Sequence, residues 1–149
     1  MTVTVGSPAP AFAANNQNGK AVSLSDFTGK KLVLYFYPKD DTPGCTAEAC
    51  SLRDNYDALI SQGYAIVGVS PDDEKKHTKF ITKYNLPFDL LADTDNAIAL
   101  AYGVWVEKSM YGRKYMGIAR TTFVMNENGI LEEIIEKVDT KNHAQQLLK

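Results

Sequence analysis

The segment KLVLYFYPKDDTPGC, residues 31–45, determines most of what can be predicted about this fold. Its first part, residues 31–37, is a nearly continuous run of aliphatic and aromatic side chains, which is typical of a strand buried on both faces of a sheet. The run stops at Pro38, and the polar residues after it indicate a loop. Thr42 suits the N-cap of a helix and Pro43 its first position. The segment therefore predicts a buried strand, a loop and a helix with Cys45 in its first turn.

Downstream of this segment, buried strands alternate with helices. The expected elements are a helix over residues 43–62, a strand over 64–69, a helix up to residue 84, a strand over 87–92 and a helix over 95–102. Ser70 suits the cap of the middle helix, and Pro71 suits its first turn. This alternation predicts strands joined by parallel crossovers.

Two hairpins are expected, one near each end of the chain. Residues 12–14 and 21–24 flank a stretch rich in Asn and Gly and predict a short hairpin. Residues 121–125 and 130–136 flank Asn-Glu-Asn-Gly and predict an antiparallel hairpin.

The remaining segments complete the predicted fold. Residues 104–118 show no clear period and are expected to form a long loop, and long loops inside domains are often functional. A last helix is expected to follow a cap at Asp139 or Thr140. The fold class is therefore α/β: a thioredoxin-like fold with a central mixed β-sheet flanked by helices and an N-terminal hairpin extension. The length favours a single domain over residues 1–149.

Composition excludes several classes of function. The chain is 44% hydrophobic and 23% charged, with a formal net charge of −2, which is ordinary for a globular protein. No basic stripe indicates nucleic-acid binding, and the longest apolar run is far too short to cross a bilayer. We therefore expect neither a nucleic acid nor a membrane as partner. No secretory signal pattern is visible at the N-terminus, so a cytoplasmic location is expected.

The chain has two cysteines, Cys45 and Cys50. A disulfide scaffold normally uses more cysteines, spread more widely, so a close pair indicates catalysis, redox sensing or metal binding. The start of a helix favours an anion, and the thiolate is the nucleophilic form of cysteine. Ligands of parallel sheets also gather beyond the carboxyl ends of strands, where the loop before Cys45 lies. These features predict a reactive Cys45.

The spacing of the two cysteines has a structural consequence. Five helical residues give about 7.5 Å of rise and a Cα–Cα separation of roughly 8–9 Å. A disulfide requires roughly 4.4–6.8 Å between Cα atoms. An intact helix therefore cannot carry a bond between Cys45 and Cys50. If the two thiols pair, the first turns of the helix must unwind.

Other interpretations of the cysteines are less consistent with the sequence. Two inert, buried thiols are common in cytosolic proteins, but Cys45 lies at a polar helix start. A zinc site needs four ligands. Only His77 and His143 could join the cysteines, neither has finger-like spacing, and each is expected to face solvent on a charged helix, so no metal is expected. An oxidoreductase of the C-x-x-C type would have its cysteines three positions apart.

The pattern Pro38-x-x-x-Thr42-x-x-Cys45 resembles the active-site signature of the peroxiredoxins. The longer strings FYPKDDTPGCTAEAC and MYGRKYMGIARTTFVMNENG are similar to the bacterioferritin comigratory protein branch, also called the Q-type peroxiredoxins. The string VGVSPDD supports this less specifically. The resemblance covers nearly the whole chain.

The resemblance implies a thiol-dependent peroxidase for hydrogen peroxide and organic hydroperoxides. Cys45 would be the peroxidatic cysteine, and its sulfenic acid would be resolved by Cys50 in an intramolecular disulfide of the atypical two-cysteine type. Thioredoxin or a similar dithiol would reduce this disulfide. The chemistry needs no metal, haem or flavin cofactor. A monomer is expected, because the mechanism requires no second chain.

Four further residues receive roles from the same resemblance. Thr42 would hydrogen-bond the thiolate and the peroxide, and Pro38 would shield the pocket from water. Arg120 would stabilise both the thiolate and the leaving oxygen, for which a permanently charged group with several donors is suited. Glu48 would hold Arg120 in place.

Two other functions remain open on the sequence alone. A redox-controlled binding module or holdase would use the helix switch to expose apolar surface without catalysis. A general thiol–disulfide oxidoreductase would exchange disulfides with other proteins.

Overall fold

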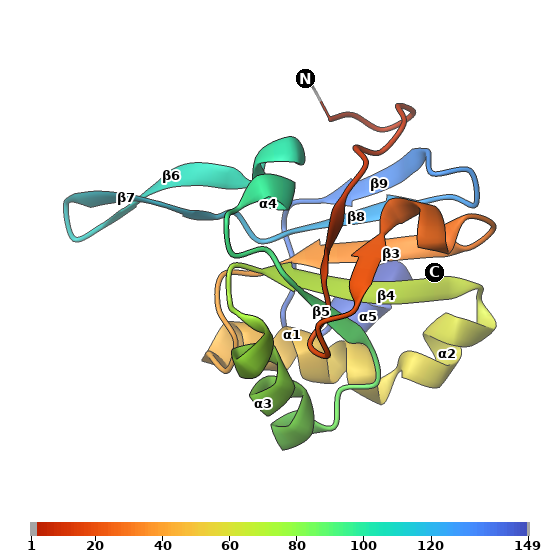
Figure 1. Ribbon diagram of the computed structural model, residues 1–149, viewed down its shortest axis with the longest axis horizontal. Helices are drawn as coiled ribbons and strands as arrows, with labels where there is room; N and C mark the ends of the chain where they lie inside the picture. The colour runs from red at the N-terminus through yellow and green to blue at the C-terminus, as the bar shows by residue number, and fades with distance from the viewer. Residues whose placement is uncertain (1–2, 149) are drawn as a thin grey trace.

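The computed structural model of the chain describes residues 3–148, and its centre is a five-stranded mixed sheet (Figure 1). The strand order is β5-β4-β3-β8-β9. The strands are β3 (Lys31–Phe36), β4 (Tyr64–Ser70), β5 (Asp89–Ala92), β8 (Thr121–Met125) and β9 (Leu131–Ile135). The first three are parallel to one another, and β8 and β9 complete the sheet as antiparallel strands. The predicted α/β fold with a central mixed sheet is confirmed.

Strand β3 divides the core into two clusters of buried side chains. Because side chains alternate across a strand, Leu32, Leu34 and Phe36 enter the first cluster. Their neighbours on the opposite face enter the second cluster, and every residue from 32 to 37 is at most 1% exposed. The prediction of a strand buried on both faces is confirmed.

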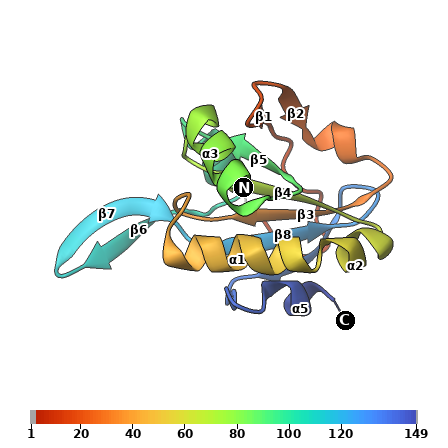
Figure 2. The ribbon, with the colours of Figure 1, turned by 90° about the horizontal axis from the view of Figure 1, so that it is seen from below.

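Four helices cover the face of the second cluster. They are α1 (Pro43–Asp54), α2 (Tyr56–Ser61), α3 (Glu74–Tyr84) and α5 (His143–Leu147). Each contributes buried side chains to that cluster, among them Leu52, Leu59, Phe80 and Leu147. Helices α1 and α5 lie side by side beneath the sheet (Figure 2). This contact brings the C-terminal helix close to the helix that carries both cysteines.

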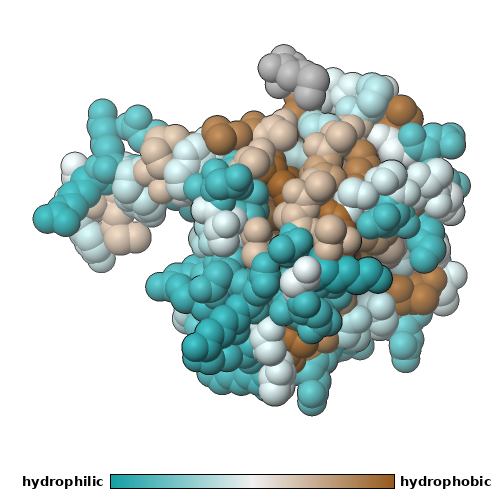
Figure 3. Space-filling model, viewed as in Figure 1, coloured by the Kyte–Doolittle hydropathy of each residue, from teal (hydrophilic) through white to brown (hydrophobic). Residues whose placement is uncertain are grey.

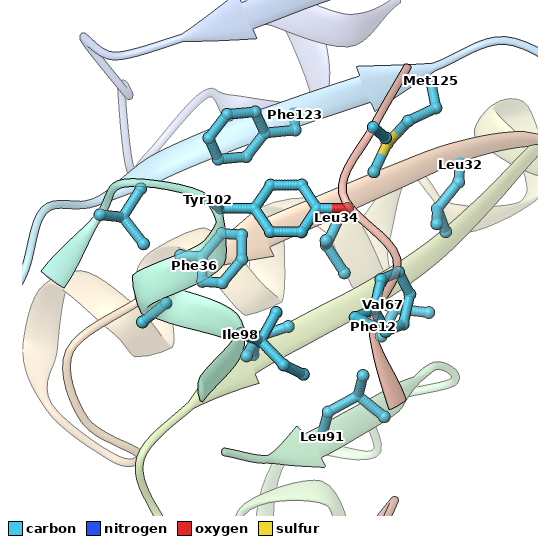
Figure 4. Close-up of a cluster of buried hydrophobic side chains, with 14 of the residues drawn as sticks. Phe12, Leu32, Leu34, Phe36, Val67, Leu91, Ile98, Tyr102, Phe123 and Met125 are labelled. Carbon is cyan, nitrogen blue, oxygen red and sulfur yellow. The ribbon is translucent and has the colours of Figure 1, made fainter. Parts of the chain in front are cut away.

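The opposite face of the sheet is covered by the N-terminal hairpin and a short helix. The hairpin consists of β1 (Ala13–Asn15) and β2 (Ala21–Ser23), which confirms the prediction, and a 3₁₀ turn, η1 (Leu24–Phe27), follows it. Helix α4 (Ala97–Ala101) precedes Tyr102, whose ring packs 5.4 Å from Phe36 and 5.0 Å from Phe123 between ring centroids (Figure 4). These aromatic contacts fill the first cluster.

The predicted loop over residues 104–118 is wrong, because this segment forms an antiparallel hairpin. Its strands are β6 (Trp105–Met110) and β7 (Arg113–Ile118), and they project from the body of the molecule as an arm (Figures 1 and 3). Tyr111 and Gly112 connect them with φ angles of 52° and 79°, the geometry of a two-residue type I′ turn. Most side chains of the arm are exposed on both faces, so burial imposes no alternating pattern on its sequence.

Two helix boundaries also differ from the prediction. The helix expected over residues 43–62 is interrupted at Asn55, whose side chain donates a hydrogen bond to the carbonyl of Ser51 at 2.9 Å. Ser70 does not cap α3, because its backbone is still paired with β5. The cap is Asp73, which accepts a hydrogen bond from the Lys76 amide at 2.9 Å.

The last helix begins later than predicted. Its N-cap is Asn142, and neither Asp139 nor Thr140 occupies that position. The Asp139 carboxylate instead accepts a hydrogen bond from the Lys141 amide at 3.2 Å and stabilises the turn before α5. Between residues 3 and 148, no helix is long and apolar enough to cross a membrane.

Candidate active site

Cys45 lies in the first turn of α1, directly after the loop that follows β3. Thr42 is the N-cap and Pro43 the first helical residue, as predicted. The thiol is 2% exposed and belongs to the second cluster, and both cysteines are free. The Thr42 hydroxyl donates its proton to the Lys39 carbonyl at 2.9 Å rather than to the site. Its oxygen is therefore left as an acceptor.

One guanidinium joins the thiol to a buried carboxylate. Arg120 immediately precedes β8, the neighbour of β3, and its Nη2 lies 3.3 Å from the Cys45 Sγ. Its Nη1 donates to Glu48 Oε1 at 2.7 Å. A Cβ atom on Gly44 would lie 3.1 Å from Arg120 Nη2, so the glycine gives the guanidinium room beside the helix. The structure thus brings Cys45, Glu48 and Arg120 together.

The electrostatics of this contact are set by burial. Glu48 is fully buried, and burial raises its pKa to about 7, although Arg120 opposes the shift. The Arg120 pKa is also raised: its partial burial acts in the other direction but is outweighed by the negative charges of Cys45 and Glu48. The guanidinium therefore remains charged beside the sulfur.

His143 was predicted to face solvent, and this is wrong. It is fully buried at the start of α5, where its Nε2 lies 2.8 Å from Thr122 Oγ1 and 3.4 Å from Glu48 Oε2. Burial lowers the pKa of its imidazole. A histidine in a short, weakly patterned terminal helix gives little sequence signal, although Ala144 and Leu147 mark a buried face.

His77 was also predicted to face solvent, and it too is fully buried. Its Nδ1 lies 2.7 Å from Asp40 Oδ2, and its Nε2 lies 2.9 Å from the carbonyl of Leu91. The spacing of His77, Phe80 and Tyr84 (i, i+3, i+7) could have placed it on the buried face of α3. It connects α3 to the loop that precedes Cys45.

That loop, residues 37–42, is held by further contacts. Asp40 accepts a hydrogen bond from the Tyr37 hydroxyl at 2.6 Å. Asp41 has a left-handed φ of 58°, and its carboxylate accepts hydrogen bonds from Lys83 at 2.8 Å and from Tyr84 at 2.9 Å. These bonds lower the pKa of Asp41, that from Lys83 most. Helix α3 therefore fixes the approach to the helix that carries Cys45.

The other predicted site residues, Pro38 and Cys50, flank Cys45 in the sequence. Pro38 is half-buried at the start of the loop. Cys50 is partly exposed, five residues further along α1. A residue that the sequence did not indicate is Lys108 of β6: burial and the charge of Arg120 lower its pKa, while Cys45 opposes the shift. It adds a second cation near the thiol.

A metal centre finds no support in the geometry. In the part of the chain that the structure describes, no three His, Cys, Asp or Glu side chains are grouped so that they could hold a metal ion. The arrangement around Cys45 is instead suited to nucleophilic sulfur chemistry, with a fixed cation facing the sulfur and helix amides behind it.

Comparison with known proteins agrees with this geometry. Residues 5–134 match the AhpC/TSA family. The chain is 46% identical over 149 residues to the peroxiredoxin Bcp of Bacillus subtilis, covering all of this chain and 95% of the relative.

Two solved structures are also similar. A PrxQ variant from Xylella fastidiosa has a TM-score of 0.93 and 30% identity, with 99% of this chain and 94% of that chain covered. The bacterioferritin comigratory protein of Xanthomonas campestris, described by its alkyl peroxide reduction activity, has a TM-score of 0.87 and 36% identity. The match covers 92% of this chain and 87% of that protein.

The fold and site define a thioredoxin-like enzyme with a thiol at a helix start in contact with an arginine. The chain belongs to the AhpC/TSA family and is a peroxiredoxin, a peroxidase-type oxidoreductase, of the Bcp/PrxQ kind.

Proposed function

We propose that this chain reduces hydrogen peroxide and organic hydroperoxides, with Cys45 as the attacking thiol. The observation that carries the proposal is the 3.3 Å contact of Arg120 Nη2 with the Cys45 Sγ, with the same guanidinium held by Glu48. The alkyl peroxide reduction attributed to the Xanthomonas campestris relative supports organic hydroperoxides as substrates.

In the first step, the Cys45 thiolate attacks one peroxide oxygen and the O–O bond breaks. The sulfur gains an S–O bond and becomes a sulfenic acid, while the second oxygen leaves as an alkoxide or hydroxide and takes up a proton. Arg120 faces the sulfur, which loses its negative charge in this step. The same guanidinium can stabilise the negative charge that develops on the leaving oxygen. The Thr42 oxygen, whose own proton is donated to Lys39, can accept the O–H of the peroxide. Pro38 shields the pocket from water.

In the second step, the Cys50 thiol attacks the sulfenic sulfur. An S–S bond forms, the hydroxyl leaves as water, and Cys45 is protected from further oxidation. Both residues lie on α1, so the start of this helix must unwind for the bond to form. A dithiol such as thioredoxin then reduces the disulfide by exchange. Both oxidation steps take place within one chain, so the mechanism requires only a monomer, and the proposed location is the cytoplasm.

Peroxide consumption coupled to thioredoxin, thioredoxin reductase and NADPH tests the roles of the cysteines. Cys45→Ser is expected to abolish turnover. Cys50→Ser is expected to retain the first oxidation and stop at the sulfenic acid, as thiol counting and mass spectrometry after a stoichiometric peroxide pulse would report. Full turnover by Cys45→Ser would overturn the proposal.

The same peroxide pulse tests the first alternative, because a holdase would react slowly and bind a partner in one redox state only. A separate insulin-reduction assay tests the second, because a general oxidoreductase would reduce insulin.

Arg120→Lys tests the contact between Arg120 and Cys45, on which the proposal rests. A lysine ammonium cannot bridge the sulfur and the carboxylate as a planar fork does, so the first oxidation of Cys45 is expected to slow by about 100-fold. Arg113→Lys, on the exposed arm, is the matched control and should leave the rate unchanged. Equal rates for both variants in rapid-mixing peroxide kinetics would contradict the role of Arg120.

A further inference from the structure

A buried polar contact connects the site to the C-terminal helix. Glu48 Oε1 accepts from Arg120, but the fully buried Glu48 Oε2 has no hydrogen-bond partner among residues 3–148. The group facing it is His143 Nε2, at 3.4 Å. A buried carboxylate oxygen without a donor costs free energy, so the protonation of His143 decides how this contact is satisfied.

The orientation of Gln146 fixes the tautomer of His143. Its side-chain amide is held at both ends, because Oε1 accepts from the Asp139 amide at 3.0 Å and Nε2 donates to the Lys137 carbonyl at 3.0 Å. The oxygen therefore faces His143 Nδ1 at 2.7 Å, and Nδ1 must be the donor. In the neutral ring, Nε2 then carries a lone pair, which accepts a hydrogen bond from the Thr122 hydroxyl at 2.8 Å and lies 3.4 Å from Glu48 Oε2.

The Thr122 hydroxyl satisfies the ring nitrogen but leaves Glu48 Oε2 without a donor, and a proton shared between Nε2 and Oε2 supplies one. We propose that His143 is a positioning residue that holds one buried proton jointly with Glu48, so that the positive charge of Arg120 remains available to Cys45. The inference rests on the proposed role of Cys45. With the proton present, Glu48, His143 and Arg120 together carry one positive charge. Without it, the Glu48 carboxylate neutralises Arg120.

Several other charged or titratable groups act on this pair. Arg120 interacts electrostatically with both groups, Tyr35 with Glu48, and Glu133 and Asp139 with His143. Cys45 lies three residues before Glu48 on the same helix. Burial raises the pKa of Glu48 to about 7 and lowers that of His143. The two groups share one site, so they titrate as a pair. The buried proton is therefore expected to be lost as the pH rises through neutrality.

Alkylation of Cys45 by iodoacetamide tests the proposal without peroxide, so its outcome is independent of peroxidase activity. The background is Cys50→Ser, which leaves a single thiol. In His143→Gln, the side-chain amide cannot hold the proton, and by donating a hydrogen bond to Glu48 Oε2 it favours the ionised carboxylate. At pH 6 we expect alkylation to be about tenfold slower than in the Cys50→Ser background, which corresponds to a coupling of about one pK unit. At pH 8.5 we expect the two proteins to react at equal rates.

The matched control is Ser51→Ala. Ser51 Oγ accepts from the Ala144 amide at 3.0 Å, so its removal loosens α5 against α1 without removing a titratable group. The ratio of the Cys45 alkylation rate in Ser51→Ala to that in the Cys50→Ser background should not vary with pH. A rate ratio for His143→Gln that is constant with pH, or a Ser51→Ala ratio that varies in the same way, would overturn the proposal.

Nitrogen NMR of the imidazoles provides a second measurement on the intact protein. The chain has two histidines, and His77→Gln assigns the signals of His143. We expect a protonated Nδ1 throughout and an Nε2 shift that moves between pH 6 and 8, and Glu48→Gln should abolish this movement. An Nε2-protonated neutral tautomer, or no movement in the unmodified protein, would also overturn the proposal.

Discussion

At the scale of single residues, the proposed reactivity of Cys45 depends on how closely one guanidinium can approach it. Arg120 is held by Glu48 on one side and reaches the sulfur on the other. The approach passes directly over Gly44, where an added Cβ would lie 3.1 Å from Arg120 Nη2. A glycine inside a helix is otherwise unfavourable by about 1 kcal/mol relative to alanine. Its presence here is explained by the space that Arg120 needs.

Gly44→Ala is therefore expected to affect stability and reactivity in opposite directions. The helix gains up to about 1 kcal/mol of intrinsic propensity, whereas the guanidinium must move by a few tenths of an ångström away from the sulfur. Urea unfolding should show a free energy of unfolding that is unchanged or higher, and oxidation of Cys45 by peroxide should be slower. An unchanged oxidation rate would show that Arg120 does not depend on this space.

The residues of this site differ in how far the sequence could predict them. The contact of Arg120 with Cys45 and Glu48 was expected, because these residues belong to a recognisable signature. His77 and His143 were not, because their burial depends on partners distant in the sequence, Asp40 and Glu48. A histidine on a helix rich in charged residues is expected to be exposed until the face of the helix that packs against the core is known. The neighbours of a buried polar group are a property of the fold, not of its local sequence.

At the scale of elements, the proposed mechanism places two incompatible requirements on α1. The helix must be intact to place Cys45 beside Arg120, and its start must unwind before Cys50 can reach Cys45. Glu48 lies between the two cysteines and is fully buried in the closed helix, and we expect unwinding of this turn to expose it. The titration of this carboxyl is therefore linked to the opening of the helix.

The sign of that linkage follows from the direction of the pKa shift. In the closed helix the Glu48 pKa is raised from 4.5 to about 7, so the closed form binds the proton more tightly than the open form. The closed form is most favoured below pH 4.5 and loses stability as the pH rises to about 7. The loss is at most roughly 3 kcal/mol, and it is constant above that range.

Hydrogen exchange of the amides of residues 45–50 measures this opening. After correction for the intrinsic pH dependence of exchange, opening in the reduced protein is expected to increase between pH 5 and pH 7. Glu48→Gln removes the titrating group and should show no such increase. If both proteins opened equally at every pH, the buried carboxyl would have no part in the unwinding that Cys50 requires.

Prediction of the elements succeeded where burial imposes a pattern. Strand β3 was recognisable because both of its faces are buried, and β4 for the same reason. The arm formed by β6 and β7 was not recognisable, because its side chains are mostly exposed and only the Tyr111-Gly112 turn specifies it. The break between α1 and α2 was missed because neither Gly nor Pro marks it; the side chain of Asn55 donates there to the Ser51 carbonyl.

At the scale of the whole molecule, the site is assembled by the order of the strands. The segment before β8 lies beside the end of β3 because these strands are neighbours, which brings Arg120 to Cys45 across 75 positions of sequence. Helix α5 packs against α1 and adds His143 on the other side of Glu48. The arm, in contrast, extends away from the sheet (Figures 1 and 2).

Shortening the arm tests whether it contributes to the stability of the body. Val106 and Gly117 are paired across the two strands, so residues 107–116 can be replaced by Asn-Gly, which favours a type I′ turn. The removed side chains include Met110, Tyr111 and Met116, which are 56%, 99% and 48% exposed. Urea unfolding is therefore expected to show a change of less than about 1 kcal/mol in the free energy of unfolding.

The control for this deletion is Phe123→Ala, which removes a ring that is 2% exposed in the first cluster. Its expected cost is about 3–5 kcal/mol, although it changes far fewer atoms than the deletion. Burial, not the number of atoms removed, should decide which variant is less stable. If the shortened arm proved as costly as the loss of Phe123, the ends of β6 and β7 next to the sheet would have to be part of the core. The fold itself would then hold Lys108 near Arg120.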